Sequence, residues 1–378
     1  MTAGDSHRPL LVAMLLVCIC CPRTTFAEGQ LSIKPFFEVR QQFEDNVFQV
    51  PSESDPESDF VTNIWTGVDF KASFDKGTHL FARYEAAPRQ FADFEEKNRH
   101  DHLLSVLFRR RLLRNVTFLG VGNLGLRFQP NDTIQEYIKH DYTGQVHVQW
   151  SAPWSSQFGV EWRNKYFPNN KNNAYISLMA EARARRRLGA LSHIQAGYQI
   201  RAYDGAIDPR VLLSGLNPDM DGVRQTVGLS FESMVFGRVL MDWRYQFEVD
   251  IATRELQRHE RLPSEPEQTS EFDDDDEVEV DFNFYTHRVG SMFVWRMLQR
   301  STVSLSARHH FKFYRDWIVP TTNKKRRDNL TLFRIGFKQD LLEHLSTRLE
   351  YTLEKKNSND PSQEFTGNTY SIRLQYTF

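Results

Sequence analysis

The chain has 378 residues, of which 40% are hydrophobic, 25% charged and 13% aromatic, and its mean hydropathy is −0.54. This composition excludes a protein that crosses a membrane by apolar helices, and the 29 Phe, 13 Tyr and 7 Trp exclude a disordered chain. The formal net charge of −2 gives no support for a nucleic-acid partner bound by bulk charge, so any functional charge must be local.

The N-terminus has the pattern of a secretory signal peptide. A basic segment ending at Arg8 precedes an apolar run from Pro9 to Cys21, which is too short to span a bilayer. Small residues follow and predict cleavage near Ala27, leaving residues 28–378 as one mature domain. All three cysteines lie in the removed segment, so no disulfide framework is expected. A lipoprotein anchor is the alternative, but large residues precede the cysteines where a small one is needed.

The mature chain alternates between apolar and polar residues from end to end, which predicts β-strands. In the segment 370–378, tyrosine, isoleucine, leucine and phenylalanine side chains alternate with Ser, Arg, Gln and Thr. The segment 60–74 repeats the pattern, and its polar face is charged. No run with helical spacing longer than about two turns interrupts the series.

Segment length separates the two folds that share this pattern. Strands of a soluble β-sandwich run about 5 to 6 residues, whereas these segments run about 10 to 17 residues, which suits tilted transmembrane strands. Tight and long connections also alternate, as in outer-membrane barrels. We therefore predict an all-β, antiparallel transmembrane barrel of about 16 strands (roughly 14 to 18), with both termini in the periplasm. Tight connections are expected at 75–77, 113–115, 151–154, 188–190, 236–237, 298–300 and 342–344, and long ones at 50–58, 91–101, 130–133, 169–173, 205–222, 254–277, 318–327 and 357–362.

The last residues resemble the C-terminal assembly signal of outer-membrane barrels. Such barrels commonly end on an aromatic residue that the barrel assembly machinery reads, and this chain ends on Phe378 with Tyr376 two positions earlier. The alternative is an ordinary edge strand that ends on a phenylalanine.

A barrel of this size leaves a water-filled lumen unless a loop plugs it. When the polar face of each strand is turned inward, basic residues in the lumen outnumber acidic ones, which favours the passage of an anionic solute. The alternative is that charged pairs simply solvate a wet wall. Arg110 and Arg186 fall on the opposite face and are expected at the edge of the lipid band. The predicted basic pore-lining residues are Arg109, Arg111, Arg163, Lys165, Arg183, Arg185, Arg201, Arg244, Arg308, Lys312, Arg334, Lys338 and Arg373.

Two further features have structural and functional interpretations. Four aromatic residues lie among polar residues that we assign to the lumen: Trp65, Phe81, Tyr285 and Trp295. Aromatic rings in a lumen suit sliding carbohydrate, but the aromatic girdles of the membrane interface are the favoured use of such rings.

The acidic run Asp273, Asp274, Asp275, Asp276 and Glu277 is expected to be a solvated loop. Loose Ca²⁺ binding or an acidic constriction inside the lumen are its alternatives.

Catalytic and metal-binding patterns are weak. The segment His100-Asp101-His102 with Ser105 is the nearest approach to a hydrolase site, and it lacks the family neighbours. His309 and His310 are adjacent on a strand, so their imidazoles point to opposite faces and cannot chelate one metal. We therefore predict no catalytic residues, no metal, no cofactor and no enzymatic activity.

The first strand and its loop resemble a known family. The segment 36–48 contains Glu44-Asp45-Asn46, and Ser58-Asp59-Phe60 opens the next strand. This is similar to the start of outer-membrane barrel proteins encoded with extracellular-polysaccharide synthesis and export systems, where Asp-Asp-Asn precedes a loop and then Ser-Asp. Glu44 departs from the first Asp of that triplet, and the match covers only about 35 residues of the mature chain.

The resemblance implies an outer-membrane conduit that carries a secreted polysaccharide to the cell surface. By this resemblance it would work with a periplasmic polysaccharide export protein and an inner-membrane polymerase or transporter, and the polymer itself would be its cargo. The barrel and its C-terminus add outer-membrane lipids and the barrel assembly machinery as expected partners. Together with the basic lumen, it makes export of an anionic polysaccharide the first hypothesis. A diffusion porin for anions or sugars is the second, and an outer-membrane enzyme or structural barrel is the third.

Overall fold

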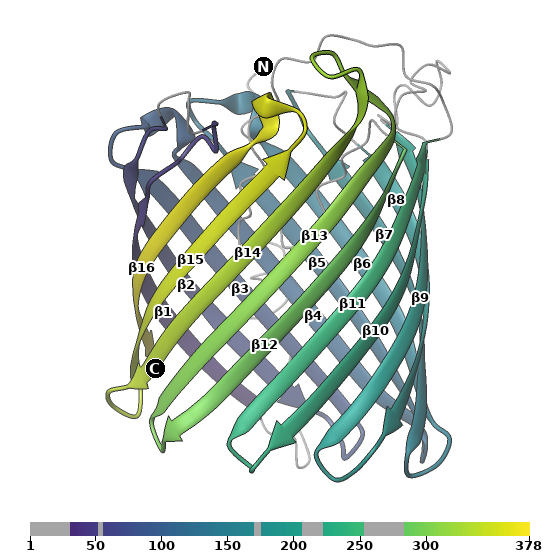
Figure 1. The fold of residues 1–378 in the computed structure, drawn as a ribbon. Coiled ribbons are helices and arrows are strands. Elements are labelled where there is room, and N and C mark those ends of the chain that lie inside the picture. Colours follow the sequence, from purple (N-terminus) through teal and green to yellow (C-terminus); the bar gives the residue numbers. More distant parts are fainter. Residues whose placement is uncertain (1–30, 52–55, 170–174, 206–221, 253–282) are drawn as a thin grey trace, which may run out of the picture.

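The computed structural model describes residues 31–51, 56–169, 175–205, 222–252 and 283–378, which form one closed barrel of 16 strands (Figure 1). Each strand pairs antiparallel with its neighbours in the sequence, and β1 pairs with β16 to close the sheet. The predicted fold class is thereby confirmed, including the number of strands. Three single-turn 3-10 helices lie in loops, and none of the helices in the described ranges is long and apolar enough to cross a membrane.

The strands have 13 to 19 residues. They are β1 Leu31–Glu44, β2 Asp59–Ser73, β3 Thr78–Phe91, β4 Arg99–Leu113, β5 Val116–Phe128, β6 Tyr137–Gln149, β7 Trp154–Tyr166, β8 Tyr175–Arg187, β9 Ser192–Gly205, β10 Gly222–Val235, β11 Val239–Ala252, β12 Phe284–Leu298, β13 Ser301–Val319, β14 Lys324–Asp340, β15 Leu345–Ser358 and β16 Phe365–Thr377. The single-turn helices are η2 Glu95–Lys97, η3 Thr133–Gln135 and η5 Pro361–Gln363.

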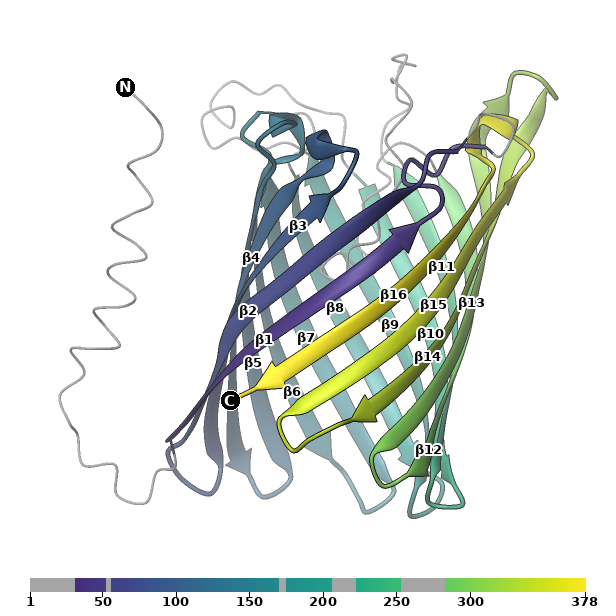
Figure 2. The same cartoon turned by 90° about the vertical axis from the view of Figure 1, so that its left-hand side faces the viewer.

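The two rims of the barrel differ. All seven predicted tight connections join strands at one rim, which we call the short-turn rim, and most of the longer connections lie at the other, the long-loop rim (Figure 1). Strand β16 ends at the short-turn rim, next to the start of β1 (Figure 2). The backbone N–H of Phe378 donates to the carbonyl of Pro35 at 3.1 Å, so the last residue takes part in barrel closure. The periplasmic position of this rim stays a prediction, as does recognition of Tyr376 and Phe378 by assembly machinery.

The prediction of a long loop at 318–327 is wrong. Strands β13 and β14 continue through it and are joined by a four-residue turn, so that Val319 pairs with Lys324 in a hairpin that rises above the rim (Figures 1 and 2). The polar character of this segment led to its prediction as a loop, but the guanidinium of Arg326 lies over the ring of Trp317 at 4.0 Å. This cation–π contact lets a charged residue pack within a strand.

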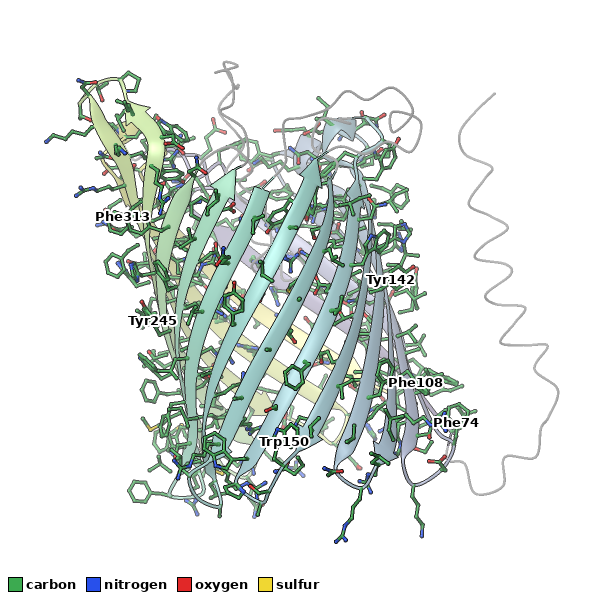
Figure 3. All side chains as sticks on the ribbon, turned by 90° about the vertical axis from the view of Figure 1, so that its right-hand side faces the viewer. Phe74, Phe108, Tyr142, Trp150, Tyr245 and Phe313 are labelled. Carbon is green, nitrogen blue, oxygen red and sulfur yellow. The ribbon has the colours of Figure 1, made fainter. Side chains whose placement is uncertain are left out.

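The outer face of the barrel is apolar. Along each strand, exposed large hydrophobic residues alternate with inward polar ones, and the labelled aromatic side chains Phe108, Tyr142 and Trp150 lie outside the wall (Figure 3). A soluble barrel would turn this surface inward, so the exposed apolar band fits contact with lipid. Trp295 is 46% exposed on the outer face, and Tyr285 lies on the same face of β12. Of the four aromatic residues assigned to the lumen from the sequence, these two are outward and Trp65 and Phe81 are inward.

Candidate functional site

The inner wall is the candidate functional surface. Residues paired across neighbouring strands share a face, so the register carries the inward assignment around the barrel from buried Arg40, which pairs with Arg373 on β16. The register places on the inward face all thirteen basic residues assigned to the lumen: Arg109, Arg111, Arg163, Lys165, Arg183, Arg185, Arg201, Arg244, Arg308, Lys312, Arg334, Lys338 and Arg373.

A belt of ion pairs lines the lumen, and many of its pairs lie toward the long-loop rim. On β4 and β5, Asp101 forms an ion pair with Arg99 at 3.1 Å and accepts a hydrogen bond from Arg127 at 2.8 Å. On β6 and β7, Asp141 accepts from Arg163 at 2.7 Å. These side chains are at most one-tenth exposed, because each long cation packs against the wall beside its carboxylate. Paired in this way, the charges make the wall polar but add little net field.

The belt continues around the rest of the barrel. Arg201 on β9 reaches Glu161 on β7 at 3.1 Å, and Arg224 on β10 reaches Asp250 on β11 at 2.7 Å. Strand β16 is tied to β1 through Arg373 and Glu38, whose charged atoms are 3.0 Å apart. The remaining belt pairs include Arg288 with Glu248, Arg326 with Asp328, Arg334 with Glu350 and Arg348 with Glu350.

The belt includes residues that the sequence analysis missed. Arg99 and Arg326 lie in segments predicted as loops, and the strands extend through both segments. The signal was present for Arg99, because it is ten positions from Arg109 and shares its strand parity. The cross-strand pairs of the belt, such as Arg127 with Asp101, had no such signal, because they depend on register.

Toward the short-turn end of the lumen some basic groups are paired, such as Arg244 with Asp242 at 2.6 Å and Lys338 with Asp340 at 3.4 Å, and others are not. Arg109 and Arg111 on β4 and Arg185 and Arg187 on β8 are exposed and inward. Within the described ranges none of the four has an ion-pair partner, although Arg185 lies 2.8 Å from Nδ1 of His193. The next inward arginine on β8, Arg183, is paired with Glu181 at 2.6 Å. The mouth at this rim is therefore more electropositive than the belt.

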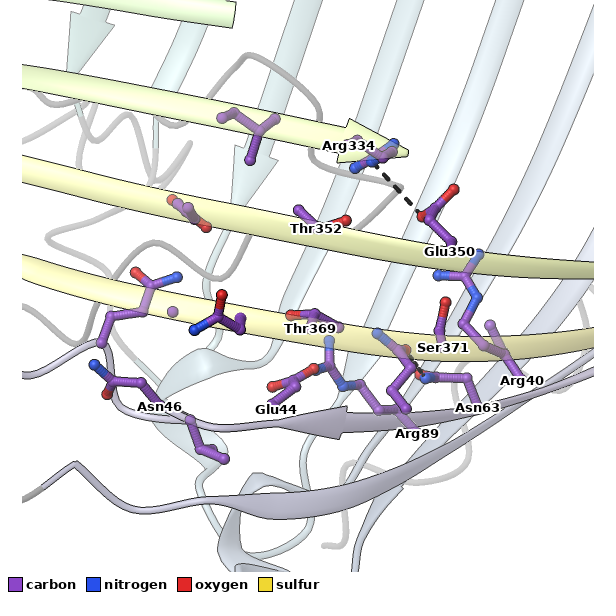
Figure 4. A pocket seen from close by; sticks show the side chains of 18 of the residues that line it. Arg40, Glu44, Asn46, Asn63, Arg89, Arg334, Glu350, Thr352, Thr369 and Ser371 are labelled. Atoms are coloured by element: carbon purple, nitrogen blue, oxygen red, sulfur yellow. Dashed lines mark hydrogen bonds and ion pairs between the residues drawn. The ribbon is translucent and has the colours of Figure 1, made fainter. Parts of the chain in front are cut away.

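A pocket opens in the inner wall between β1–β4 and β14–β16 (Figure 4). Arg40, Arg89, Arg99 and Arg334 contribute guanidinium groups to it, and Trp65 contributes an indole that Arg40 covers at 4.8 Å. Much of the remaining lining is amide and hydroxyl: Gln42, Asn46, Gln49, Asn63, Asn368, Thr352, Thr369 and Ser371. Glu44, Asp101, Glu350 and Glu354 also line the pocket and balance its four arginines, so the amides, hydroxyls and ring are suited to hydrogen-bonding a polyhydroxylated solute.

The residues that carry the family resemblance hold the long-loop rim together. Glu44 pairs with Arg89 at 2.6 Å. Asp45 accepts from the backbone and side-chain nitrogens of Asn368 on β16 at 2.5 and 2.6 Å. Asn46 donates to the carbonyls of Val50 and Thr366 at 2.8 and 3.0 Å. The triplet thus anchors the β1–β2 loop across the closing seam of the barrel, which is a structural role.

Asp59 has a related role in the next loop. It is 2% exposed, and its carboxylate accepts from the backbone N–H groups of Ala92, Asp93 and Phe94 at 3.1 to 3.2 Å. We expect Asp59→Ala to destabilise the barrel by about 2–3 kcal/mol, since buried N–H donors lose a charged acceptor. Urea unfolding in micelles and protease cleavage within 92–98 measure the effect. Asp93→Ala in the same loop removes an exposed carboxylate and is the control; equal stability of the two variants would contradict the prediction.

The candidate catalytic and metal residues are not brought together. His102 is outward and hydrogen-bonds the hydroxyl of Tyr84 at 2.9 Å, whereas Ser105 is inward on the same strand. His309 and His310 lie on opposite faces of β13, as expected. In the part of the chain that the structure describes, no three His, Cys, Asp or Glu side chains are grouped to hold a metal ion. The predicted signal peptide and the acidic run 273–277 lie outside the described residues.

Comparison with solved structures supports the fold. The chain is similar to the outer membrane channel DcaP of Acinetobacter baumannii, with 10% identity, a TM-score of 0.55, and coverage of 93% of this chain and 98% of that one. It is also similar to the outer membrane protein OpdK of Pseudomonas aeruginosa, with 8% identity, a TM-score of 0.53, and coverage of 92% and 99%. No protein-family model matches the chain, and no curated protein matches it.

The prediction that the chain is not an enzyme is corrected. The solved structures that match also include OmpT, an outer membrane protein of Vibrio cholerae, with 10% identity, a TM-score of 0.48, and coverage of 93% of this chain and 99% of that one. This likeness concerns the barrel alone and assigns no activity, but the barrel fold gives no ground for excluding one, so the prediction is withdrawn. The fold is that of outer-membrane β-barrel proteins, and the narrower resemblance to polysaccharide-export barrels belongs with the proposed function.

Proposed function

We propose that this protein is an outer-membrane pore for anionic solutes, and that its principal cargo is a secreted anionic polysaccharide. The observation that carries the proposal is the charge of the lumen: a closed 16-strand barrel has an ion-paired belt and, at its short-turn mouth, exposed inward arginines without carboxylate partners. A confined lumen screens charge poorly, so these arginines lower the cost of admitting an anion.

The direction of transport follows from the position of the unpaired arginines. If the short-turn rim faces the periplasm, as in other barrels of this type, a polyanion first meets Arg109, Arg111, Arg185 and Arg187. It then passes the belt, whose paired charges hold it weakly and let it leave. The hydroxyl-rich and amide-rich pocket by the long-loop rim is suited to brief contacts with sugar units.

The first loop supports a polysaccharide more than another anion. Its Glu44-Asp45-Asn46 and Asp59 resemble barrels of export systems, although in this chain these residues anchor loops. By that resemblance, a periplasmic export protein would deliver the polymer to the short-turn rim.

Polymer on the cell surface tests this proposal. We expect deletion of the gene to remove surface polysaccharide, measured by sugar composition, and complementation with the wild-type gene to restore it. A charge-reversed form, Arg183→Glu/Arg185→Glu, should restore it poorly if the cargo is anionic. Arg110→Glu/Arg186→Glu, which changes two arginines on the opposite face of the wall, is the matched control. Unchanged surface polymer in the deletion strain would reject export.

A second candidate is a diffusion porin for small anions, favoured by the same unpaired arginines. Conductance distinguishes the two, because a porin passes chloride and small organic acids in a planar bilayer without any partner, and its deletion causes an uptake defect with normal surface polymer.

A further inference from the structure

One part of the lumen wall is apolar. On β3, β4 and β5 the inward residues include Phe81, Leu103, Leu107, Leu119 and Val121, which we call the luminal apolar patch. Phe81 pairs with Leu107, and Leu107 pairs with Val121, so these three side chains are neighbours on adjacent strands. They lie between the ion-pair belt and the arginines of the short-turn mouth.

Lipid contact does not account for this patch. The outward residues of the same strands, such as Leu104, Val106 and Phe108, already supply the lipid-facing band, so β4 is apolar on both faces. The five luminal side chains are half-buried, and none is enclosed by the protein as a core residue would be. Apolar surface facing an aqueous lumen is costly, and such a patch generally marks a binding surface.

Two cations flank the patch without a carboxylate partner. The Nζ atom of Lys71 lies 5.4 Å from the ring of Phe81, and Arg109 pairs in register with Leu119 at the lower edge. Both side chains are exposed, and neither forms an ion pair with any residue that the structure describes. An apolar surface edged by two uncompensated positive charges is complementary to an anion that carries an apolar body.

We infer that the luminal apolar patch, with Lys71 and Arg109, is a binding site for amphiphilic anions, meaning a carboxylate or sulfonate attached to an aromatic or acyl group. The apolar body lies against Leu107 and Val121, and the anionic group is held by the two cations. This proposal adds a solute class to the proposed function. It rests on that function only because the solute must reach the site through the lumen.

Titration of the purified full-length barrel in micelles tests the site, with naphthalene-2-sulfonate as probe and ethanesulfonate as the comparison anion of equal charge. We expect naphthalene-2-sulfonate to bind at least about tenfold more tightly than ethanesulfonate, since its rings bury apolar area on the patch. Leu107→Ser/Val121→Ser should lower the affinity for naphthalene-2-sulfonate by about tenfold and leave the affinity for ethanesulfonate unchanged. Met292→Ser/Val294→Ser changes inward apolar residues on β12 and should alter neither affinity.

A second variant tests the charges without touching the apolar residues. Lys71→Gln/Arg109→Gln alters two exposed side chains, so the barrel is expected to fold. This variant should bind both anions more weakly than the wild type. Equal affinity of the two anions for the wild-type barrel, or an unchanged affinity of naphthalene-2-sulfonate in both variants, would overturn the inference. Chloride conductance is measured separately: a barrel that binds the probe but passes no chloride keeps this site and loses the proposed pore.

Discussion

Gly67→Ala is expected to destabilise the barrel by about 3 kcal/mol, the upper end of the range for overpacking. Gly67 faces the lumen on β2, where a Cβ would overlap the carbonyl oxygen of Tyr84 and lie 2.5 Å from a ring carbon of Phe36. Phe36 packs with Trp65 and Ala87 in a small cluster, so its ring has little room to move. The carbonyl belongs to the β2–β3 hairpin and is fixed by pairing. The loss of stability is measured by urea unfolding, in which the folded fraction is read from the gel mobility of the unheated sample.

The same substitution at another inward strand glycine is the control. At Gly290 on β12 a Cβ would meet Arg308 Cγ at 3.6 Å and Ala307 O at 3.9 Å, which are ordinary contacts. Gly290→Ala should therefore change stability little. Combined with Phe36→Ala, Gly67→Ala should cost less than it does in the wild type, because the clashing ring is gone and only the overlap with the Tyr84 carbonyl remains. Equal stability of Gly67→Ala and Gly290→Ala would contradict the close packing of Phe36 and the Tyr84 carbonyl around Gly67.

Reversing the charge of the short-turn mouth is expected to reverse the ion selectivity of the pore. Arg109→Glu/Arg111→Glu/Arg185→Glu replaces three inward cations with anions and changes the local charge by six units. We expect the permeability ratio of chloride to potassium, taken from the reversal potential in a KCl gradient, to fall by at least about tenfold at low salt. The effect should shrink in 1 M KCl, where charges are screened beyond about 3 Å.

Arg110→Glu/Arg186→Glu is the matched control for this experiment. These arginines are adjacent to the three in sequence but lie on the outer face, and Arg186 covers the ring of Trp154 at 5.3 Å. Their reversal should leave selectivity unchanged in barrels that show the folded band. If the outer pair shifts the reversal potential as much as the inner three, the assignment of faces at this rim is wrong.

The excess of basic residues in the lumen has a different meaning once the structure is known. Arg163, Arg201 and Arg373 were grouped with Arg109 and Arg185 because all occupy inward positions. The first three contact carboxylates, and the last two do not. Among the described residues, the exposed inward arginines without an ion pair are grouped at the short-turn mouth, with Arg308 farther along the lumen on β13. The two predictions on mouth charge and apolar patch both concern the short-turn end of the lumen.

Much of the architecture was determined by the sequence alone, because a strand's side chains alternate with a period of two and lipid demands one apolar face. The alternation along 370–378 and the spacing of tight turns such as 75–77 and 236–237 were enough to predict about 16 strands and the inward face of most of them, although Tyr285 and Trp295 on β12 are outward. The error at 318–327 arose because a polar segment between strands is expected to be a loop, and the contact of Arg326 with Trp317 cannot be seen in the sequence.

Only the tertiary structure decided which charges are neutralised. Whether Arg201 meets Glu161 depends on the stagger between β7, β8 and β9, and a one-residue slip would turn either side chain to the lipid. The same holds for Glu44-Asp45-Asn46, whose partners on β3 and β16 are far away in the sequence. Periodicity acts within a strand and can be read from one chain segment, whereas register is set by the closure of the whole barrel.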